Sequence, residues 1–374
     1  MTGGGARAAY QVGVLRALSE LLPPAAPCPF PIISGTSAGA VNAAVLAVDA
    51  FSFRRGVRRL MTVWKNIHVE HVYRADPIGA LGNSVRWLAA MVTGGLLGAN
   101  DVSLLDASPL EALLERYVDL SLIQENIESG HLTAFSVTCS GYTSGQSVTF
   151  YQGRPGLENW RRARRIGVAM PITLDHLLAS SALPLIFRPV HINREYFGDG
   201  SMRQIAPVSP ALHLGADRLL VIGVGRQLIP DAERVKTMGS PSIAQIVGHA
   251  LNSIFLDSLE VDLERLQRIN RTLDIIPQEV LHTTRYPLRR VAFRVIRPSV
   301  DLDQIAAAHA SELPRTIRML LRTVGGMKRN ASTLLSYLLF ERGYCRALIR
   351  LGYNDTMSRK DDLAAFLLAS EPVI

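Results

Sequence analysis

Apolar and polar residues alternate in blocks along the first 226 residues, and their spacing predicts strands and helices in turn. Short apolar runs are typical of strands, whereas longer segments with apolar residues at helical spacing are typical of helices. The predicted strands cover residues 31–34, 132–139, 148–151 and 218–224, and the predicted helices cover residues 37–48, 109–118 and 174–182.

The order of these elements predicts an α/β fold. Residues 142–145 have the composition of a turn and predict a hairpin between the second and third strands. The run 218–224 is almost entirely apolar, as is typical of a strand that is covered on both faces. Strands that alternate with helices predict a mostly parallel sheet between helical layers.

The pattern changes after residue 226. Residues 227–242 contain two prolines and mixed charge and are predicted to be a linker. Residues 243–374 are predicted to be a mainly helical extension, in which Leu256, Leu259, Leu263 and Leu266 recur at helical spacing. We expect this leucine stripe to pack against the first domain, residues 1–226, rather than to form a binding groove.

The composition favours a protein with a large core. Hydrophobic residues make up 48% of the chain and the mean hydropathy is +0.17. The nearest candidate for a membrane span, residues 87–97, is shorter than the ~18 residues that cross a bilayer, and we interpret it as a buried or interfacial helix. The three distant cysteines, Cys28, Cys139 and Cys345, favour a reduced compartment and predict neither a disulfide framework nor a metal site.

Arginine clusters account for much of the formal net charge of +8. Basic residues beside aromatic ones suit an anionic membrane surface, although for any single cluster a solvated face is the simpler interpretation. No segment resembles a nucleic-acid-binding module, so we expect no nucleic-acid partner. The clusters are Arg54, Arg55, Arg58 and Arg59; Arg161, Arg162, Arg164 and Arg165; and Arg285, Arg289, Arg290, Arg294 and Arg297.

The first candidate for chemistry is the sequence Gly-Thr-Ser-Ala-Gly at residues 35–39, between a predicted strand and a predicted helix. A nucleophile elbow needs this context, because the sharp turn exposes the serine hydroxyl at a helix N-terminus. Ser37 is therefore a candidate nucleophile, flanked by Gly35 and Gly39. The pattern also occurs by chance, so an ordinary turn before a buried helix remains the alternative.

The second candidate is the run of Gly3, Gly4 and Gly5 before Arg7. Successive glycines let backbone N–H groups converge on a phosphate or an oxyanion. A dinucleotide site fits poorly, because Ala8 stands where that motif has its last glycine and no strand precedes the loop. An ordinary glycine turn is the remaining alternative.

The third candidate is Asp199, which lies between Gly198 and Gly200 just after an aromatic strand end. Asp-Gly alone usually marks a turn. The pair gains weight because none of the histidines after Asp199 lies in a glycine-rich turn. Those histidines are His213, His249, His282 and His309.

Together the three motifs resemble those of the patatin-like phospholipase family. The likeness covers about residues 3–225, and the segments after it resemble the helical C-terminal extension of a bacterial subgroup. It implies a three-layer α/β fold and a lipid acyl hydrolase, of phospholipase A or lysophospholipase type, that needs no cofactor or metal ion. The implied site residues are Ser37 as nucleophile, Asp199 as base, Gly3, Gly4, Gly5 and Arg7 as oxyanion loop, and Gly35, Gly39 and Gly200 as motif glycines.

The implied reaction transfers an acyl group to water through an acyl-enzyme on Ser37. Asp199 takes the serine proton directly, with no histidine between them. Burial facing an apolar groove would raise the pKa of Asp199 toward the range that a general base needs. Arg7 is open to three interpretations: a solvated surface residue, an anchor for the glycine loop, or a contact for a lipid phosphate.

Three departures from the family pattern matter. Ala8 replaces a glycine of the loop motif, and Ser201 replaces the glycine or alanine that follows Asp-Gly. The family also has an apolar strand before the glycine loop, whereas only Met1 and Thr2 precede it here. We therefore expect that the strand that aims this loop is missing from the start of the chain.

Two other functions are left open. One is a conventional Ser-His-Asp α/β-hydrolase esterase, although an elbow at residue 37 comes before the several strands that normally precede it in that fold. The other is an inactive module that binds membrane surfaces. For the hydrolase we expect a membrane-lipid substrate and a cytoplasmic protein that is peripheral to the inner face of the membrane.

Overall fold

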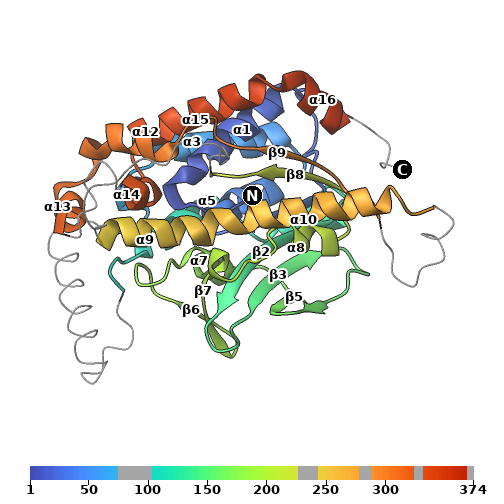
Figure 1. Ribbon diagram of the computed structural model, residues 1–374, viewed down its shortest axis with the longest axis horizontal. Coiled ribbons are helices and arrows are strands. Elements are labelled where there is room, and N and C mark those ends of the chain that lie inside the picture. Colours follow the sequence, from blue (N-terminus) through green and yellow to red (C-terminus); the bar gives the residue numbers. More distant parts are fainter. Residues whose placement is uncertain (75–102, 226–242, 278–288, 324–331, 369–374) are drawn as a thin grey trace.

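The computed structural model describes residues 1–74, 103–225, 243–277, 289–323 and 332–368 (Figure 1). The apolar stretch 87–97 and the predicted linker 227–242 lie outside the described residues. So do Arg285 of the third arginine cluster and His282.

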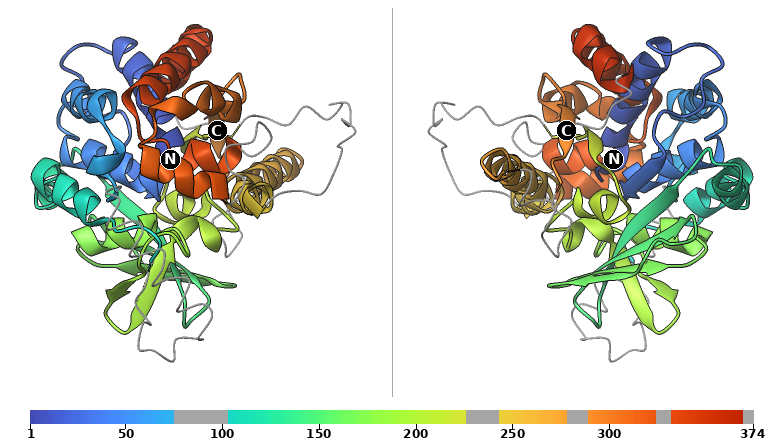
Figure 2. Two further views of the ribbon diagram at one scale, coloured as in Figure 1. Left: turned by 90° about the vertical axis from the view of Figure 1, so that its left-hand side faces the viewer. Right: turned by 90° about the vertical axis from the view of Figure 1, so that its right-hand side faces the viewer.

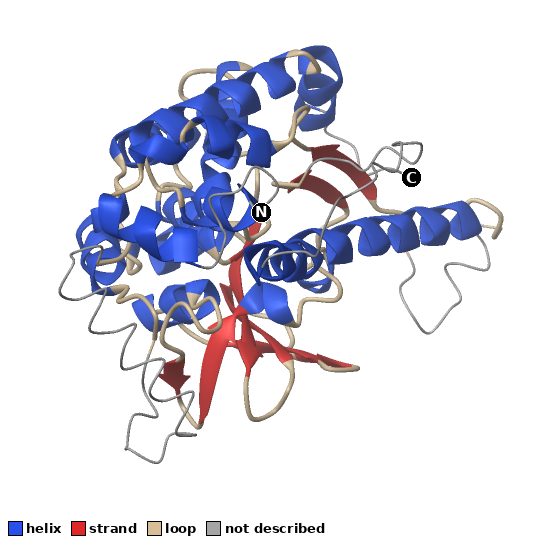
Figure 3. Cartoon of the chain, turned by 60° about the vertical axis from the view of Figure 1, so that its left-hand side comes forward, coloured by secondary structure: helices blue, strands red, loops and turns tan. Residues whose placement is uncertain are grey.

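Strands between residues 32 and 199 form a mixed sheet (Figure 3). In the described part of the chain it has seven strands, in the order β4-β5-β3-β2-β7-β6, and β1 also pairs with β2. The strands are β1 (Ile32–Thr36), β2 (Ala134–Gly141), β3 (Ser147–Gly153), β4 (Trp160–Arg162), β5 (Arg165–Ala169), β6 (Val190–Ile192) and β7 (Glu195–Asp199).

The strand directions correct the expectation of a mostly parallel sheet. Only the pairs β1–β2 and β3–β5 of this sheet are parallel, whereas β2–β3, β2–β7, β4–β5 and β6–β7 are antiparallel. Short turns such as 142–146, the predicted hairpin, reverse the chain without a crossover helix, and such connections produce antiparallel pairs. The α/β fold with a helical C-terminal region is confirmed.

A second, two-stranded sheet lies apart from the first (Figure 3). Strand β8 (Arg218–Ile222), which the apolar run predicts, pairs in parallel with β9 (Ala292–Ile296) from the C-terminal region. The leucine stripe packs here as expected, because Leu259, Leu263 and Leu266 are buried in one cluster with residues of β8.

Helices flank the main sheet and make up most of the C-terminal region (Figure 1). The predicted helices correspond to α2, α5 and α7, and both α2 and α7 pack on β2. The helices of the first domain are α1 (Ala9–Glu20), α2 (Ala38–Val48), α3 (Phe53–Asn66), α5 (Ser108–Tyr117), α6 (Leu122–Glu128), α7 (Leu174–Ser181) and α8 (Ser209–His213). Those of the C-terminal region are α9 (Ile243–Asn252), α10 (Ser258–Leu273), α12 (Leu302–Ala308), α13 (Arg315–Thr323), α14 (Ser332–Leu338), α15 (Arg342–Met357) and α16 (Lys360–Leu368).

The short helices mark the joints of the structure. The 3₁₀ helix η1 (Gly5–Ala8) leads the glycine loop into α1, and η3 (Gly200–Met202) follows β7. The π-helix η4 (Ser253–Asp257) joins α9 to α10. Two further 3₁₀ turns, η2 (Val69–His71) and η5 (Ala310–Glu312), lie elsewhere on the chain.

The two ends of the chain pack together through α1 and α15, which lie side by side (Figure 2). A Cβ at Gly13 would overlap the carbonyl of Ile349, and a Cβ at Gly352 would overlap the carbonyl of Tyr10. Glycines on both helices therefore allow the backbones to approach closely. Because α15 covers it, α1 is buried on nearly all sides.

Residues Met1 and Thr2 lie between β1 and β8. The Met1 amine donates to the Ser34 carbonyl at 2.8 Å, and the Thr2 amide donates to the Ile222 carbonyl at 3.3 Å. These two residues thus bridge strands of the two sheets just before the glycine loop. A cavity of about 420 Å³ continues between the same two strands.

We predict that Gly352→Val destabilises the protein by about 1–3 kcal/mol more than Asn354→Val, because overpacking would force α15 away from α1. Both changes place the same side chain on α15, but Asn354 is exposed. Urea denaturation followed by circular dichroism measures the difference. Equal stabilities of the two variants would contradict the prediction.

Candidate active site

The Gly35–Gly39 segment forms a sharp turn between β1 and α2. Ser37 has φ 55° and ψ −137°, a conformation that residues other than glycine rarely adopt. The flanking glycines make the turn possible. A Cβ at Gly35 would lie 2.5 Å from Ala40 Cα, and a Cβ at Gly39 would overlap the Thr2 carbonyl.

A second serine holds this turn in place. The Ser37 amide donates to Ser180 Oγ at 2.8 Å, and the Ser180 hydroxyl donates to the Thr138 carbonyl at 2.7 Å. Ser180 lies in α7 and is fully buried, so it links the turn to β2. Sequence reasoning did not single out Ser180, because a serine in an apolar helix has no distinctive signal.

Strand β2 brings Ser37 and Asp199 together. β1 pairs with the first part of β2 and β7 pairs with its end, so that Thr36 lies opposite Thr138 and Asp199 lies opposite Cys139. The two strands run in opposite directions and their carboxyl ends meet on one edge of β2. The residue after β1 and the last residue of β7 therefore face one another.

The Asp199 carboxylate is fully buried. Its Oδ1 accepts a hydrogen bond from the Ser201 amide at 2.9 Å. Its Oδ2 has no partner of hydrogen-bond geometry within the described residues, although the Ser37 hydroxyl is close enough to affect the carboxylate electrostatically. The Ser37 hydroxyl and the Asp199 carboxylate are therefore neighbours within the site.

Burial raises the pKa of Asp199 to about 6. Interactions with the Ser37 hydroxyl and with the amide and hydroxyl of Ser201 lower this pKa in part. The carboxylate is therefore ionised near neutral pH and far more basic than an exposed aspartate. A Cβ at Gly200 would overlap the Thr138 carbonyl, so glycine is needed for this close approach.

The glycine loop lies against Ser37. A Cβ at Gly3 would lie 2.9 Å from Ser37 Cβ and 2.6 Å from Ser201 Oγ, so the loop and the serine are in direct contact. The amides of Gly3, Gly4 and Gly5 donate to no protein acceptor among the described residues. Free amides at a helix start suit an anionic oxygen.

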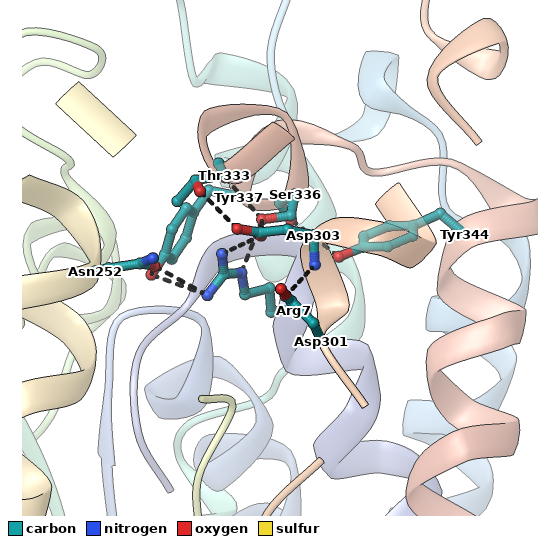
Figure 4. Close-up of polar contacts among 8 residues, drawn as sticks. All are labelled: Arg7, Asn252, Asp301, Asp303, Thr333, Ser336, Tyr337 and Tyr344. Carbon is teal, nitrogen blue, oxygen red and sulfur yellow. Dashed lines mark hydrogen bonds and ion pairs between the residues drawn. The ribbon is translucent and has the colours of Figure 1, made fainter. Parts of the chain in front are cut away.

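The Arg7 side chain points into the C-terminal region, where it contacts Asn252, Asp303 and Ser336 (Figure 4). It is 3% exposed and pairs with Asp303 at 2.6 Å, which excludes the solvated interpretation and leaves almost no guanidinium surface for a lipid phosphate. The Arg7 amide donates to the Gly4 carbonyl. Both the amide and the guanidinium of Arg7 are thus engaged within the protein, in a position to anchor the glycine loop.

None of the histidines in the described part of the chain hydrogen-bonds to Ser37 or Asp199. His213 Nδ1 donates to the Ser209 carbonyl at 3.0 Å and the His213 ring lies 4.9 Å from the Trp160 ring, and His309 pairs with Glu312. His249 is exposed on α9. His282 lies outside the described residues. Within the described residues, no group of three or more acidic, histidine or cysteine side chains could hold a metal ion.

Two of the arginine clusters are largely used within the fold. In the first, Arg55 and Arg59 pair with the buried Asp49. In the third, Arg294 pairs with Asp362 and Arg297 pairs with Glu260. The second cluster differs, because three of its four arginines, Arg161, Arg162 and Arg164, are exposed on the β4–β5 hairpin.

Comparison with known proteins identifies the class. The family model for patatin-like phospholipase matches residues 1–212, more than half of the chain, and the chain belongs to this family. No curated protein matches. Among solved structures, the crystal structure of VipD from Legionella pneumophila is similar at a TM-score of 0.33 and 15% identity, over 96% of this chain and 66% of that one. The chain thus spans just under two thirds of that protein's length.

No helix in the described residues is long and apolar enough to cross a membrane.

We predict that Asp199→Asn stabilises the protein at pH 7.5. The pKa is about 6 in the folded protein and 3.8 for an unperturbed aspartate, so ionising the buried carboxyl costs folding about 3 kcal/mol above pH 6. The cost declines as the pH falls from about 6 to 3.8, and it vanishes below the unperturbed pKa of 3.8. Denaturation with urea at pH 7.5 and pH 4 measures the difference, and a variant that is less stable than the wild type at pH 7.5 contradicts the prediction.

Proposed function

We propose that the protein is a lipid acyl hydrolase that cleaves carboxylic esters of membrane lipids through a Ser37–Asp199 dyad. The observation that carries the proposal is the strained Ser37 at the start of α2, which faces a buried carboxylate whose pKa is about 6. Membership of the patatin-like phospholipase family supports the substrate class.

In the proposed reaction, the Ser37 hydroxyl attacks the ester carbonyl and Asp199 takes its proton. The carbonyl oxygen becomes an anion, which the free amides of the glycine loop stabilise. Collapse expels the alcohol, which recovers the proton from Asp199, and leaves an acyl-enzyme on Ser37. Asp199 then takes a proton from a water molecule, whose oxygen attacks the carbonyl of the acyl-enzyme. Collapse of this second intermediate releases the fatty acid, and Ser37 recovers the proton from Asp199.

The conventional Ser-His-Asp alternative has less support. It requires a histidine beside Ser37, and the described histidines make their contacts elsewhere. The pKa of Asp199 also favours direct proton transfer, since an aspartate that only orients a histidine needs no raised pKa.

We predict that Ser37→Ala and Asp199→Asn each lower the hydrolysis of a lysophospholipid or a short-chain ester by about 10⁴-fold or more, because each removes a reacting group. Substitution of His213, His249, His282 or His309 by alanine should leave most of the activity. Product release by purified variants, with folding checked by circular dichroism, measures this. Loss of activity in one folded histidine variant would favour the triad instead.

A fluorophosphonate probe separates the hydrolase from an inactive binding module. The probe should label the wild type at Ser37 and should not label Ser37→Ala. A folded wild-type protein that takes up no probe would support the inactive module.

The exposed arginines of the β4–β5 hairpin support attachment to an anionic lipid surface. Arg161 lies opposite Ile166, and the row continues across Val148 and Cys139 to Asp199. The turn of this hairpin therefore lies at the same end of the sheet as the site. A membrane surface bound by this hairpin would therefore lie at the end of the sheet that carries the candidate site.

We predict that replacing Arg161, Arg162 and Arg164 together by glutamine weakens binding to vesicles of phosphatidylglycerol and phosphatidylcholine by about 100-fold, at roughly 1 kcal/mol per arginine. The same change at three exposed arginines elsewhere, Arg58, Arg116 and Arg315, serves as the control. Vesicle co-sedimentation at low and high salt measures the binding. Equal losses in the two triple variants would contradict a specific role for the hairpin.

A further inference from the structure

Arg7 connects the glycine loop to three helices of the C-terminal region (Figure 4). Its guanidinium donates to Asp303 Oδ1 at 2.6 Å, to Ser336 Oγ at 2.8 Å and to Asn252 Oδ1 at 3.3 Å. Asn252 ends α9, Asp303 lies in α12 and Ser336 lies in α14. Because Arg7 is 3% exposed, these charge-assisted bonds form away from water, where they are strongest.

The partners of Arg7 are themselves held in place. Both carboxylate oxygens of Asp303 are used, since Ser336 Oγ donates to one at 2.7 Å and Thr333 Oγ1 donates to the other at 2.5 Å. The Tyr337 ring lies 4.0 Å from the guanidinium, and its hydroxyl donates to Asn252. A buried charge with so many fixed partners cannot move alone without losing them.

The backbone of the glycine loop rests on the same region. Gly5 has φ +54°, and a Cβ there would overlap the Tyr337 carbonyl. A Cβ at Gly3 would lie 2.9 Å from the Phe255 ring and also 2.9 Å from Ser37 Cβ. Phe255 belongs to the π-helix η4 and stacks against Tyr337. The loop therefore touches both Ser37 and the C-terminal region.

We propose that Asp303 is a positioning residue for the reaction, which fixes Arg7 and thereby aims the amides of Gly4 and Gly5 at the oxyanion. This inference rests on the proposed hydrolysis at Ser37. It gives the C-terminal region a part in catalysis that acts through Arg7, because a shift of α12 and α14 would move Arg7 and with it the amides of the glycine loop.

The first test is Asp303→Asn, which removes the charge with little change in size. We expect kcat to fall about 10- to 100-fold while KM stays within about twofold, because misplaced amides weaken the transition state more than the bound ester. A change that only destabilises the protein would reduce the fraction of folded enzyme and would leave the kcat of the folded molecules unchanged. Active-site titration with the fluorophosphonate probe corrects kcat for that fraction.

Two further variants sharpen this test. Asp362→Asn is the matched control, because Asp362 pairs with Arg294 and Arg359 in the same region without contacting Arg7. Its kcat should equal that of the wild type. Ser336→Ala removes the hydroxyl between Arg7 and Asp303, should lower kcat about 10-fold, and serves if Asp303→Asn does not fold.

Amide hydrogen exchange of residues 1–12 gives a measurement that needs no ester. Exchange in this segment should be faster in Asp303→Asn and Ser336→Ala than in the wild type or Asp362→Asn, because the loop loses its anchor. If the wild type hydrolyses esters, kcat decides, and an unchanged kcat in both loop variants overturns the proposal. If the wild type hydrolyses none, the proposed function fails and the role of Asp303 in catalysis fails with it; exchange then tests the anchoring of the loop alone, and unchanged exchange overturns that as well.

Discussion

The candidate site depends on burying the Asp199 carboxylate next to the Ser37 hydroxyl, at a cost to the stability of the fold. Strand β2 imposes this contact, because β1 and β7 approach one edge of it from opposite directions and end at neighbouring positions, Thr138 and Cys139. Burial costs free energy, and few polar groups offset it: the Ser201 amide and hydroxyl and the Ser37 hydroxyl. The same cost raises the pKa of the carboxyl to about 6, which is what direct proton transfer from a serine needs.

The remaining parts of the candidate site are fixed by their neighbours rather than by their own segments. Ser180 reaches from α7 to hold the Ser37 amide, and Arg7 reaches from η1 to the C-terminal helices to hold the glycine loop. Met1 and Thr2 attach the start of that loop to β1 and β8. The site is therefore assembled from both ends of the chain, and the C-terminal region is packed against it rather than attached as an appendage.

The sequence predicts the local features well and the long-range ones poorly. The strand, glycine-flanked turn and helix around Ser37 have strong local patterns, and the structure has each of them. The direction of a strand relative to its neighbour depends on which strands pair. No local pattern specifies the pairing, and the sequence therefore did not predict the mixed sheet. The same holds for β9, whose partner β8 lies about 70 residues earlier. Arg7 was singled out by the motif, but its partners are about 245 to 330 positions away in the sequence and no local pattern points to them.

The most direct test of the account is the pH dependence of the rate at which a fluorophosphonate labels Ser37, measured between pH 4.5 and 8.5. The account predicts that this rate rises through an apparent pKa of about 6, and that the rise disappears together with most of the rate when Asp199 is replaced by asparagine. A rate that is constant across pH 6, or a rise that persists in the asparagine variant, would contradict it.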